Sequence, residues 1–491
     1  MAPRWLTRAL LASCCALSCA EVGDDPREAT VTSVLARADL AWIRARPALE
    51  AGRLARMAAS PYDFYRGSVA LFLHDWRDGA SGLSRSRFAL DWPAPFTVGD
   101  AHPENFGLLL GADGALSIEP NDLDAADRAP YLWDLRRLCV GLSLAARLSN
   151  DGDPAAREAA VAAARSVARA AAEGYATAVR ALASGAPREV ISDGGGVALL
   201  DDLFRRGARD RDRRAELDGL TTLDGGARRL RRGVLDPEEP TAALSDLPAF
   251  AREAIPATLE RYRRSLPSPP SPASLTVLDA AREYGSGVAS WPRVRALVLV
   301  RGESDDPGDD VILELKELGD PTLPPSLAPG VWFDDVAARV RAASRALWSR
   351  PAADPWWGTS EWLGVPVQLR RETEAAKTVR VSRMTGTAGT PDALRALAAR
   401  LGAALAGVHA APLPDGGSVI RDIDVVIQRS PAAFADEQAD VAERYAPVVL
   451  ADAARLRRAL STLGPRLGVP PDPRDAPRPD LAALLGPPET P

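Results

Sequence analysis

The chain has 491 residues, 46% hydrophobic and 26% charged, which is enough for a core of two or three domains. Its net charge of −6 excludes a broad basic surface for nucleic acid or anionic lipid. Beyond the first residues no apolar run is long enough to span a bilayer, so we expect membrane attachment through a lipid anchor only.

The N-terminus has the pattern of a cleaved export signal. Two arginines precede an apolar stretch over residues 10–18, and acidic residues follow it. Cys14 and Cys19 each end a short sequence that resembles the processing site of bacterial lipoproteins, and Cys15 lies between them. Processing at Cys19 places a longer apolar stretch before the cleavage site than processing at Cys14 does. We therefore predict removal of residues 1–18, lipidation of Cys19 and export to the periplasmic face of the inner or outer membrane. A misassigned start or an uncleaved apolar tail is the alternative.

Hydrophobic periodicity predicts an α+β chain in which helices flank a β-rich segment. Helices are expected over residues 30–58, 62–76, 131–149, 154–184, 241–265, 333–348, 392–410 and 432–463. Strands are expected over residues 96–99, 106–110, 115–118, 275–280, 294–300, 311–315 and 365–369, the second and third forming a hairpin.

In three segments the apolar residues follow neither the helical nor the strand period. Residues 185–240 are rich in Gly and charged side chains and predict a loop-rich insertion. The Pro- and Ser-rich stretch 265–274 is the best predicted internal boundary, and the Pro-rich residues 470–491 are expected to form a flexible tail.

The rarest residue types gather in one place. All basic residues are Arg except Lys316 and Lys377, and the chain has three Asn and three His. Asn105, Asn121 and His102 lie within 20 positions of one another. A composition shifted so far toward Arg and Ala keeps such residues where no substitute serves the chemistry, so this clustering indicates a functional site.

The segment GDAHPEN at 99–105, followed by NDLD at 121–124, carries the first motif. Phosphoryl transfer needs a carboxylate that orients the attacking hydroxyl and oxygen ligands for Mg²⁺. Asp100 lies five residues before Asn105 on a loop after a strand, and Asp122 follows the predicted hairpin, so all three can meet. Asp124 is a close rival to Asp122, and Glu119 a more distant one. Caps of helices and turns are the alternative role for such residues.

The second motif is a Gly-rich turn and a lysine. Gly285, Ser286 and Gly287 lie between predicted strands, where backbone N–H groups can approach phosphates. Lys316, on a later strand, would supply a point charge to the same phosphates. Arg66, in the segment SPYDFYRG, could bind phosphate bidentately or form a surface ion pair.

The first motif resembles the catalytic loop and metal-binding segment of the protein-kinase-like and aminoglycoside-phosphotransferase-like superfamily. The resemblance implies that Asp100 is the catalytic base, Asn105 a Mg²⁺ ligand and Asp122 the principal Mg²⁺ ligand, with Asp134 as a structural residue of the following helix. The second motif resembles the nucleotide-binding lobe, so the implied cofactors are ATP and Mg²⁺.

The order of the motifs is reversed relative to ordinary kinases. The resemblance therefore implies a circularly permuted two-lobe fold, with a mostly helical lobe and a small antiparallel nucleotide lobe. The expected parts are a signal peptide (1–18), a tether and helix (19–58), the catalytic-loop and metal-binding part of the helical lobe (59–184), an insertion and helix (185–270), the β-rich nucleotide lobe (271–330), the remaining helical lobe (331–469) and a tail (470–491).

Residues 50–465 also resemble the bacterial domain-of-unknown-function 2252 family. The motifs that carry this resemblance are Arg66-Gly67, GDAHPENFG, NDLD with WDLRRL, and the helix LGAALAGVHA that ends at His409. The family resemblance predicts the fold of the chain better than it predicts a reaction.

One departure concerns the partner of Lys316. Kinases hold this lysine with a Glu from a helix, and none lies near residue 342, where arginines stand instead. Glu317, Asp334 or Asp335 could substitute, or the lysine could act unpaired.

Two functional hypotheses follow. The chain is an ATP- and Mg²⁺-dependent phosphotransferase acting on an unidentified small molecule or protein, or it is a kinase-fold binding protein without turnover. A metal-dependent hydrolase ranks third, because it needs more metal ligands than these motifs supply. Cys139, on an apolar helix face, is expected to be a buried small hydrophobe.

Overall fold

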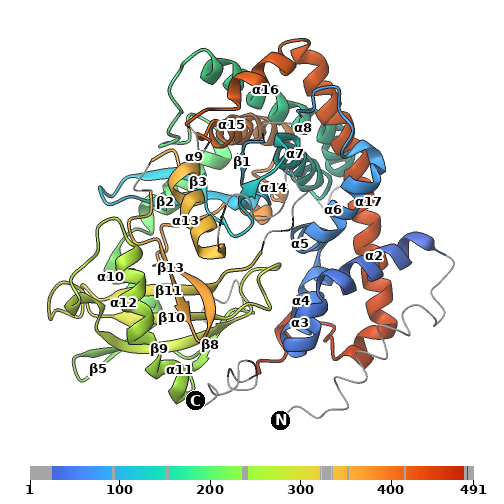
Figure 1. Cartoon of the computed structure of the whole chain (residues 1–491). Coiled ribbons are helices and arrows are strands. Elements are labelled where there is room, and N and C mark those ends of the chain that lie inside the picture. The colour runs from blue at the N-terminus through green and yellow to red at the C-terminus, as the bar shows by residue number, and fades with distance from the viewer. Residues whose placement is uncertain are drawn as a thin grey trace.

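The computed structural model describes residues 25–479, 481 and 484, except 91–93, 150–153, 235–240, 321, 323–332, 334, 351–352 and 414–415. The protein is α+β, as predicted, with 53% helix and 15% strand. A helical half and a sheet half lie against each other (Figure 1). Cys19 and the predicted signal peptide lie outside the described residues, so the structure does not bear on lipidation.

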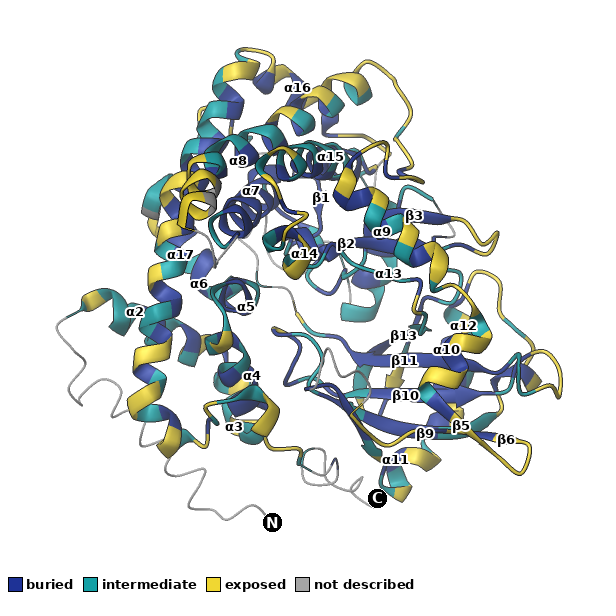
Figure 2. Ribbon diagram, turned by 180° about the vertical axis from the view of Figure 1, so that it is seen from behind, coloured by how far each residue is buried: buried dark blue, intermediate teal, exposed yellow. Residues whose placement is uncertain are grey.

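The helical half is a bundle around one buried helix. Its main members are α7 (Tyr131–Arg147), α8 (Pro154–Ala183), α15 (Pro391–His409), α16 (Ile420–Ile427) and α17 (Pro431–Leu467). Figure 2 shows α7 buried along almost its whole length. Small residues let α8 and α15 approach closely: a Cβ at Gly174 would lie 2.1 Å from the Ala399 carbonyl oxygen. Cys139, on α7, is fully buried, which confirms its predicted character.

Five N-terminal helices line the side of this bundle. They are α2 (Pro26–Ala38), α3 (Leu40–Ala45), α4 (Pro47–Ala59), α5 (Pro61–Gly67) and α6 (Val69–Asp78). The sequence predicted two longer helices here, and the chain breaks them at Asp39, Arg46 and Ser68. Pro47 and Pro61 each open a new helix, because the first helical position needs no N–H donor.

The predicted hairpin is present, as β2 (Phe106–Leu110) and β3 (Leu116–Pro120). A short pair, β1 (Phe96–Thr97) and β4 (Asp127–Arg128), lies next to it. α9 (Ala198–Arg209) contacts the hairpin, and α14 (Val381–Thr385) contacts α7. Short 3₁₀ helices are η1 (Ala80–Gly82), η2 (Pro103–Asn105), η3 (Ala273–Leu275) and η4 (Pro473–Asp475).

The sheet half contains a seven-stranded antiparallel sheet with the order β12-β13-β11-β10-β9-β8-β7. The strands are β7 (Gly233–Val234), β8 (Ala243–Asp246), β9 (Val277–Tyr284), β10 (Arg295–Val300), β11 (Val311–Glu317), β12 (Gly358–Trp362) and β13 (Val365–Arg371). The predicted strands at 275–280, 294–300, 311–315 and 365–369 are thereby confirmed.

The two faces of the sheet are covered differently. α11 (Ala249–Glu253) and α12 (Ile255–Ser265) pack on one face, where Tyr262 and Leu259 meet the even-numbered residues of β10. α10 (Arg213–Leu220) and the hairpin of β5 (Thr221–Asp224) and β6 (Ala227–Leu230) cover part of the other face. The rest of that second face carries charged side chains and turns toward the helical half.

α13 (Val336–Leu347) links the two halves. It follows β11 in the chain and lies between the sheet and the β2–β3 hairpin (Figure 1). Asp335 caps its N-terminus by accepting a hydrogen bond from Ala338 N at 2.6 Å. Just after the helix, Trp348 Nε1 donates to the Pro120 carbonyl oxygen at 2.9 Å, so the helix is tied to the hairpin.

The predictions for 185–240 and 241–265 are wrong in part. The first segment forms α9, α10 and strands instead of a loop-rich insertion, because Leu199, Leu200 and Leu203 bury one face of α9 under its charged residues. In the second, residues 243–246 join the sheet as β8 rather than starting a helix. The Pro- and Ser-rich stretch 265–274 runs between α12 and β9, which pack into the same core.

The described part of the predicted flexible tail is docked. η4 contacts α4, and Leu481 is buried in the core of the sheet half. Tyr284 Oη and Arg282 Nη1 both donate to the Pro479 carbonyl oxygen, at 2.7 and 2.6 Å. Within the described chain, none of the helices combines the length and the apolarity needed to cross a bilayer.

Candidate functional site

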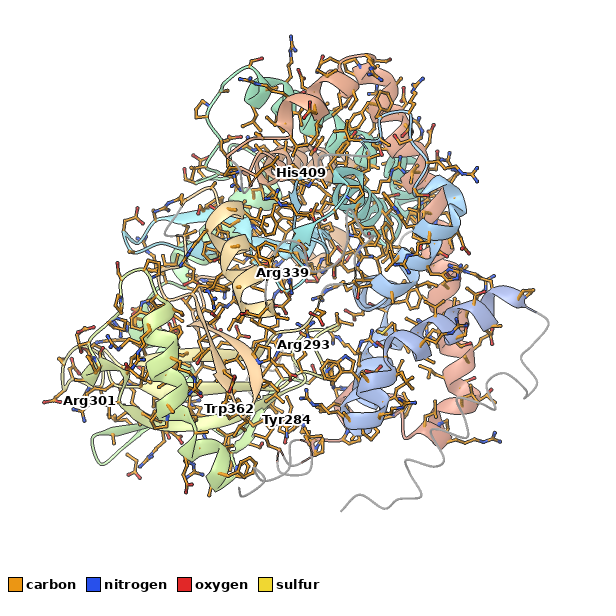
Figure 3. The ribbon with its side chains drawn as sticks, viewed as in Figure 1. Tyr284, Arg293, Arg301, Arg339, Trp362 and His409 are labelled. Carbon is orange, nitrogen blue, oxygen red and sulfur yellow. The ribbon has the colours of Figure 1, made fainter. Side chains whose placement is uncertain are left out.

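A cavity of about 1480 Å³ lies where the two halves meet. Most residues of both predicted motifs line it, although more than 150 positions separate the motifs in the chain. These are Arg66, Asp100, Asn105, Asp122, Asp124, Gly287 and Lys316. Gly285 and Ser286 lie in the adjoining turn but not among the lining residues. Figure 3 shows Arg293 and Arg339 at this junction, with His409 deep in the helical half and Arg301 at the far end of the sheet.

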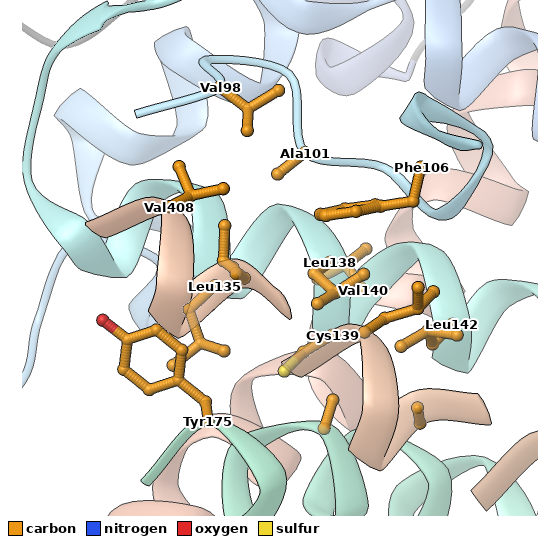
Figure 4. Close-up of a cluster of buried hydrophobic side chains, with 14 of the residues drawn as sticks. Val98, Ala101, Phe106, Leu135, Leu138, Cys139, Val140, Leu142, Tyr175 and Val408 are labelled. Atoms are coloured by element: carbon orange, nitrogen blue, oxygen red, sulfur yellow. The ribbon is translucent and has the colours of Figure 1, made fainter. Parts of the chain in front are cut away.

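The loop before Asp100 is fixed by the start of α7. Trp133 Nε1 donates to the Gly99 carbonyl oxygen at 2.6 Å. Asp134 accepts hydrogen bonds from Val98 N at 2.7 Å and from Gly99 N at 2.9 Å. The apolar residues of the same loop pack on α7, as Figure 4 shows for Val98, Ala101 and Phe106 above the leucines of the helix. The motif WDLRRL therefore holds the loop in one conformation.

His409 contacts Asp134 inside the helical half. Its Nε2 lies 3.4 Å from Asp134 Oδ2, and its Nδ1 lies 2.8 Å from Tyr175 Oη. Asp134 and His409 are fully buried. His409 thus belongs to an internal hydrogen-bonded chain across α7, α8 and α15.

Asp100 faces the cavity with one oxygen engaged. Arg137, itself fully buried, donates from Nε to Asp100 Oδ1 at 2.8 Å, and its Nη2, which donates to the Tyr65 carbonyl oxygen, lies 2.7 Å from the same Oδ1. The other oxygen, Oδ2, has His102 Nε2 at 3.9 Å. Burial raises the pKa of Asp100, and the Arg137 charge opposes this rise. The carboxylate therefore has one oxygen held by arginine and one that can accept a proton from a ligand.

Asn105 is oriented by the backbone of the same loop. Its Nδ2 donates to the Asp100 carbonyl oxygen at 2.7 Å, which leaves Oδ1 as its acceptor atom at the cavity. His102 is buried, and burial together with the charges of Arg66 and Arg137 holds its pKa well below the ordinary value. A neutral His102 leaves Asp100 the charged member of this pair.

The two aspartates of NDLD form an ion cluster with the sheet. Lys316 Nζ lies 2.6 Å from Asp124 Oδ2 and 3.2 Å from both oxygens of Asp122. Arg293 Nη1 lies 2.6 Å from the same Asp124 oxygen. Burial acts to raise the pKa of Asp122, but the Lys316 and Arg293 charges outweigh it and hold the pKa below the ordinary value. Asp124 is buried, whereas the Asp122 side chain is 38% exposed to the cavity side.

The partner of Lys316 is therefore not an acid from a helix. Glu317 accepts from Arg46 Nη1 at 2.6 Å and from Val294 N at 2.7 Å, Asp335 caps α13, and Asp334 lies outside the described residues. In place of a glutamate, α13 contributes Arg339. This buried arginine donates to the carbonyl oxygens of Asp124, Ala126 and Gly319 at 2.5 to 2.9 Å, and so holds the NDLD segment by its backbone.

The Gly-rich turn between β9 and β10 depends on its glycines. Gly285 and Gly287 have φ of +72° and +76°, a region that disfavours side chains. A Cβ at Gly285 would lie 2.0 Å from the Thr241 carbonyl oxygen. Ser286 Oγ hydrogen-bonds Glu283 rather than facing the cavity. Among the three predicted turn residues, Gly287 is the one placed to meet a ligand.

Arg66 forms an ion pair at the cavity, whereas the sequence prediction offered phosphate binding or an ion pair on the surface. Its Nη1 lies 2.9 Å from Glu104 Oε2, and Glu104 in turn accepts from Val381 N at 2.5 Å. Arg66 lines the cavity and its Nε has no hydrogen-bond partner within the described structure. Glu119, the distant rival of Asp122, is directed away and accepts from Ser349 N at 2.7 Å.

Sequence reasoning missed many charged residues of the cavity, and four of them lie near Lys316. Arg293, Arg295, Glu314 and Arg370 line the cavity with Lys316. The available signal was the alternation along β11, which puts Glu314 on the same face as Lys316. The described residues contain no group of three or more His, Cys, Asp or Glu side chains arranged to hold a metal by themselves.

Asp134→Asn tests the anchoring of the loop. The amide keeps the size of the carboxylate but removes one of two acceptors for buried N–H groups, so we expect a loss of about 2–4 kcal/mol in the free energy of unfolding. Chemical denaturation followed by circular dichroism measures it. Asp440→Asn is the control, since Asp440 is 44% exposed beside Arg165 and should cost less than about 1 kcal/mol. Equal losses in the two variants would contradict the anchoring role.

Comparison with curated proteins and with solved structures finds no match to this chain. A family model does match, and it covers residues 44–459, which include both motifs. The family is described as uncharacterised protein conserved in bacteria (DUF2252). The match spans most of the 491 residues, and the chain therefore belongs to the bacterial DUF2252 family.

Proposed function

We propose that the protein is a kinase-like phosphotransferase that uses ATP and Mg²⁺ to phosphorylate a small molecule or a protein. The observation that carries the proposal is the meeting of Asp100, Asn105, Asp122 and Lys316 at one cavity. They come from distant parts of the chain, and each belongs to a motif chosen for phosphate chemistry. Caps of separate helices and turns have no reason to converge in this way.

The strand order of the sheet half supports the same proposal. The Gly-rich turn joins β9 to β10, Lys316 lies on the next strand, β11, and a helix, α13, follows. Protein kinases likewise carry a Gly-rich loop, then a lysine on the third strand and then a helix. Here these elements come after the loop with Asp100 in the chain, which agrees with the proposed circular permutation of a two-lobe fold.

The residues present fit a Mg²⁺ ion bound with phosphates. Mg²⁺ prefers oxygen ligands and commonly takes one or two from the protein, the others being phosphate and water. Asn105 Oδ1 and the partly exposed Asp122 would hold it, and Asp124 Oδ1, which accepts no hydrogen bond within the described structure, is a further oxygen. Bound there, the ion would neutralise charge on the transferred phosphoryl group.

Asp100 would orient the acceptor hydroxyl and take its proton. Arg137 holds Oδ1, so Oδ2 is the accepting atom. Asp122 and Asp124, which pair with Lys316 in this structure, would be the carboxylates that hold the ion, and Lys316 would then pair with the phosphates. Gly287 permits close approach of the turn to the phosphate chain.

A kinase-fold binding protein without turnover is the second candidate, and one observation favours it. Asp124 is held by two cations, Lys316 and Arg293, and α13 supplies Arg339 where a glutamate would position the lysine. Lys316 and the metal then compete for the same carboxylates. In that case nucleotide binds but is not turned over.

Asp122→Asn tests the metal and nucleotide site. With Mg-ATP at about 100 times its Kd, wild-type protein should gain about 3 °C in Tm, because a ligand at that excess stabilises the native state. The variant lacks the anionic ligand and should lose most of this shift. Asp113→Asn, at an exposed hairpin position paired with Arg350, serves as the control and should keep it. Absence of any shift in wild type sinks the proposal of nucleotide binding.

Asp100→Asn separates transfer from binding. We expect turnover of ATP, with water as acceptor, to fall at least about 100-fold while the Mg-ATP affinity stays within about threefold. Because the ionised carboxylate is the active form and its pKa is raised, wild-type turnover should rise with pH through a pKa above 3.8. Steady-state rates between pH 4 and 8 measure this. Binding without turnover in wild type would favour the second candidate.

We also propose export and lipidation at Cys19, on the strength of the N-terminal signal pattern. Labelled palmitate should be incorporated into wild-type protein in bacterial cells and not into Cys19→Ala. Cys14→Ala should remain labelled. Labelling of Cys19→Ala, or none of wild type, would overturn this assignment.

A further inference from the structure

The part of the cavity beside Lys316 is made of charged side chains. β10, β11 and β13 are neighbours, with Arg295 opposite Lys316 and Glu314 opposite Arg370 in the register. Glu314 accepts hydrogen bonds from Arg295 through one oxygen and from Arg370 Nε through the other, at 3.0 Å. Three cations and Glu314 thus line this stretch of the cavity, Glu283 lies opposite Arg295 on β9, and Arg293 lies next to them at Asp124.

These charges are fixed as ions. Burial acts to raise the pKa of Glu314, but Arg370 and Arg295 outweigh it and lower the pKa to about 2. Each of the three side chains is at most 25% exposed. Two arginines therefore share one carboxylate, and both keep N–H groups that can bind a further anion.

Beside Lys316 a nucleobase finds mainly small apolar side chains, such as Val69, Val288 and Val381, while Leu109, Leu110 and Trp356 line a second cavity of about 310 Å³ that shares Arg370. Ligand sites for aromatic rings are mostly apolar, with a few polar groups. The described residues that line the cavity beside Lys316 include no Leu, Ile, Met, Phe or Tyr. Trp42 is the one large aromatic side chain among them, and Arg46 already lies over its ring, 4.9 Å from the centroid. A flat base placed on the Arg295–Glu314–Arg370 bridge would remove water from these ions without replacing its hydrogen bonds.

We propose that the donor site recognises a linear phosphate chain with Mg²⁺ and draws little affinity from a base, so that inorganic tripolyphosphate is a donor equivalent to ATP. This inference rests on the proposed function and specifies its donor. A chain of phosphates offers many anionic oxygens to Arg293, Arg295, Lys316 and Arg370, which a base cannot use. In the transfer, the acceptor oxygen bonds the terminal phosphorus, the bridging P–O bond breaks to release pyrophosphate, and Asp100 takes the hydroxyl proton.

Calorimetric titration of the wild-type protein with ATP, CTP and tripolyphosphate, each in excess Mg²⁺, tests the inference. We expect the three Kd values to agree within about threefold, since a base that stacks well would gain about tenfold or more. ATP binding at least about tenfold tighter than tripolyphosphate, or than CTP, overturns the inference and leaves the proposed function intact. Failure of all three ligands to bind overturns both. Tripolyphosphate binding without ATP binding overturns the equivalence of the two donors and refutes ATP as the donor.

Arg370→Gln adds a test inside the site. If Arg370 binds the phosphate chain, the variant should weaken all three ligands by the same factor, about tenfold. If the variant loses affinity for ATP and CTP but not for tripolyphosphate, Arg370 contacts the base, and the inference is contradicted. Arg301→Gln is the matched control, because Arg301 lies at the far end of the sheet beside Asp305 (Figure 3). Circular dichroism checks folding, and if Arg370→Gln does not fold, the wild-type titrations decide by themselves.

Discussion

The ion cluster of Lys316, Arg293, Asp122 and Asp124 joins the two halves of the molecule. Lys316 and Arg293 come from the sheet, and the aspartates follow the hairpin of the helical half. Both cations meet at one buried Asp124 oxygen, and removal of either partner of such a pair leaves an uncompensated charge. This contact joins segments that lie far apart in the chain, and the cavity lies where they meet.

The helical half positions its share of the site through α7. Asp134 accepts hydrogen bonds from the backbone before Asp100, Arg137 binds the Asp100 carboxylate, and His409 contacts Asp134. Arg339 does the same for the NDLD segment through backbone carbonyls. Positioning groups are buried, whereas Asp122 stays partly exposed at the cavity. Buried positioning groups keep the backbone of the site in one conformation, and the partly exposed Asp122 carboxylate can reach a ligand.

The charged side chains Arg295, Glu314 and Arg370, which line the cavity from the sheet, matter for both candidate functions. An Arg–Glu–Arg bridge on the sheet suits phosphates better than an aromatic base, whether or not transfer follows. Under the proposed phosphotransfer, turnover would require that Asp122, which pairs with Lys316 in this structure, can bind Mg²⁺ instead. The two questions are separate, because the first concerns the residues that bind the donor and the second concerns the exchange of one cation for another at the same carboxylates.

The sequence by itself predicted the hairpin and most strands, and it singled out Asp100 and Asn105, which the structure places at one cavity, because these signals depend on local periodicity and on rare residue types. It gave misleading signals at 185–240, where a narrow apolar stripe on α9 was hidden among charges. Tertiary structure alone decided the partner of Lys316, the role of Arg339 and the Arg295–Glu314–Arg370 bridge. Ion pairs between distant segments leave no periodic trace in a chain, since any arginine can pair with any carboxylate that folding brings within reach.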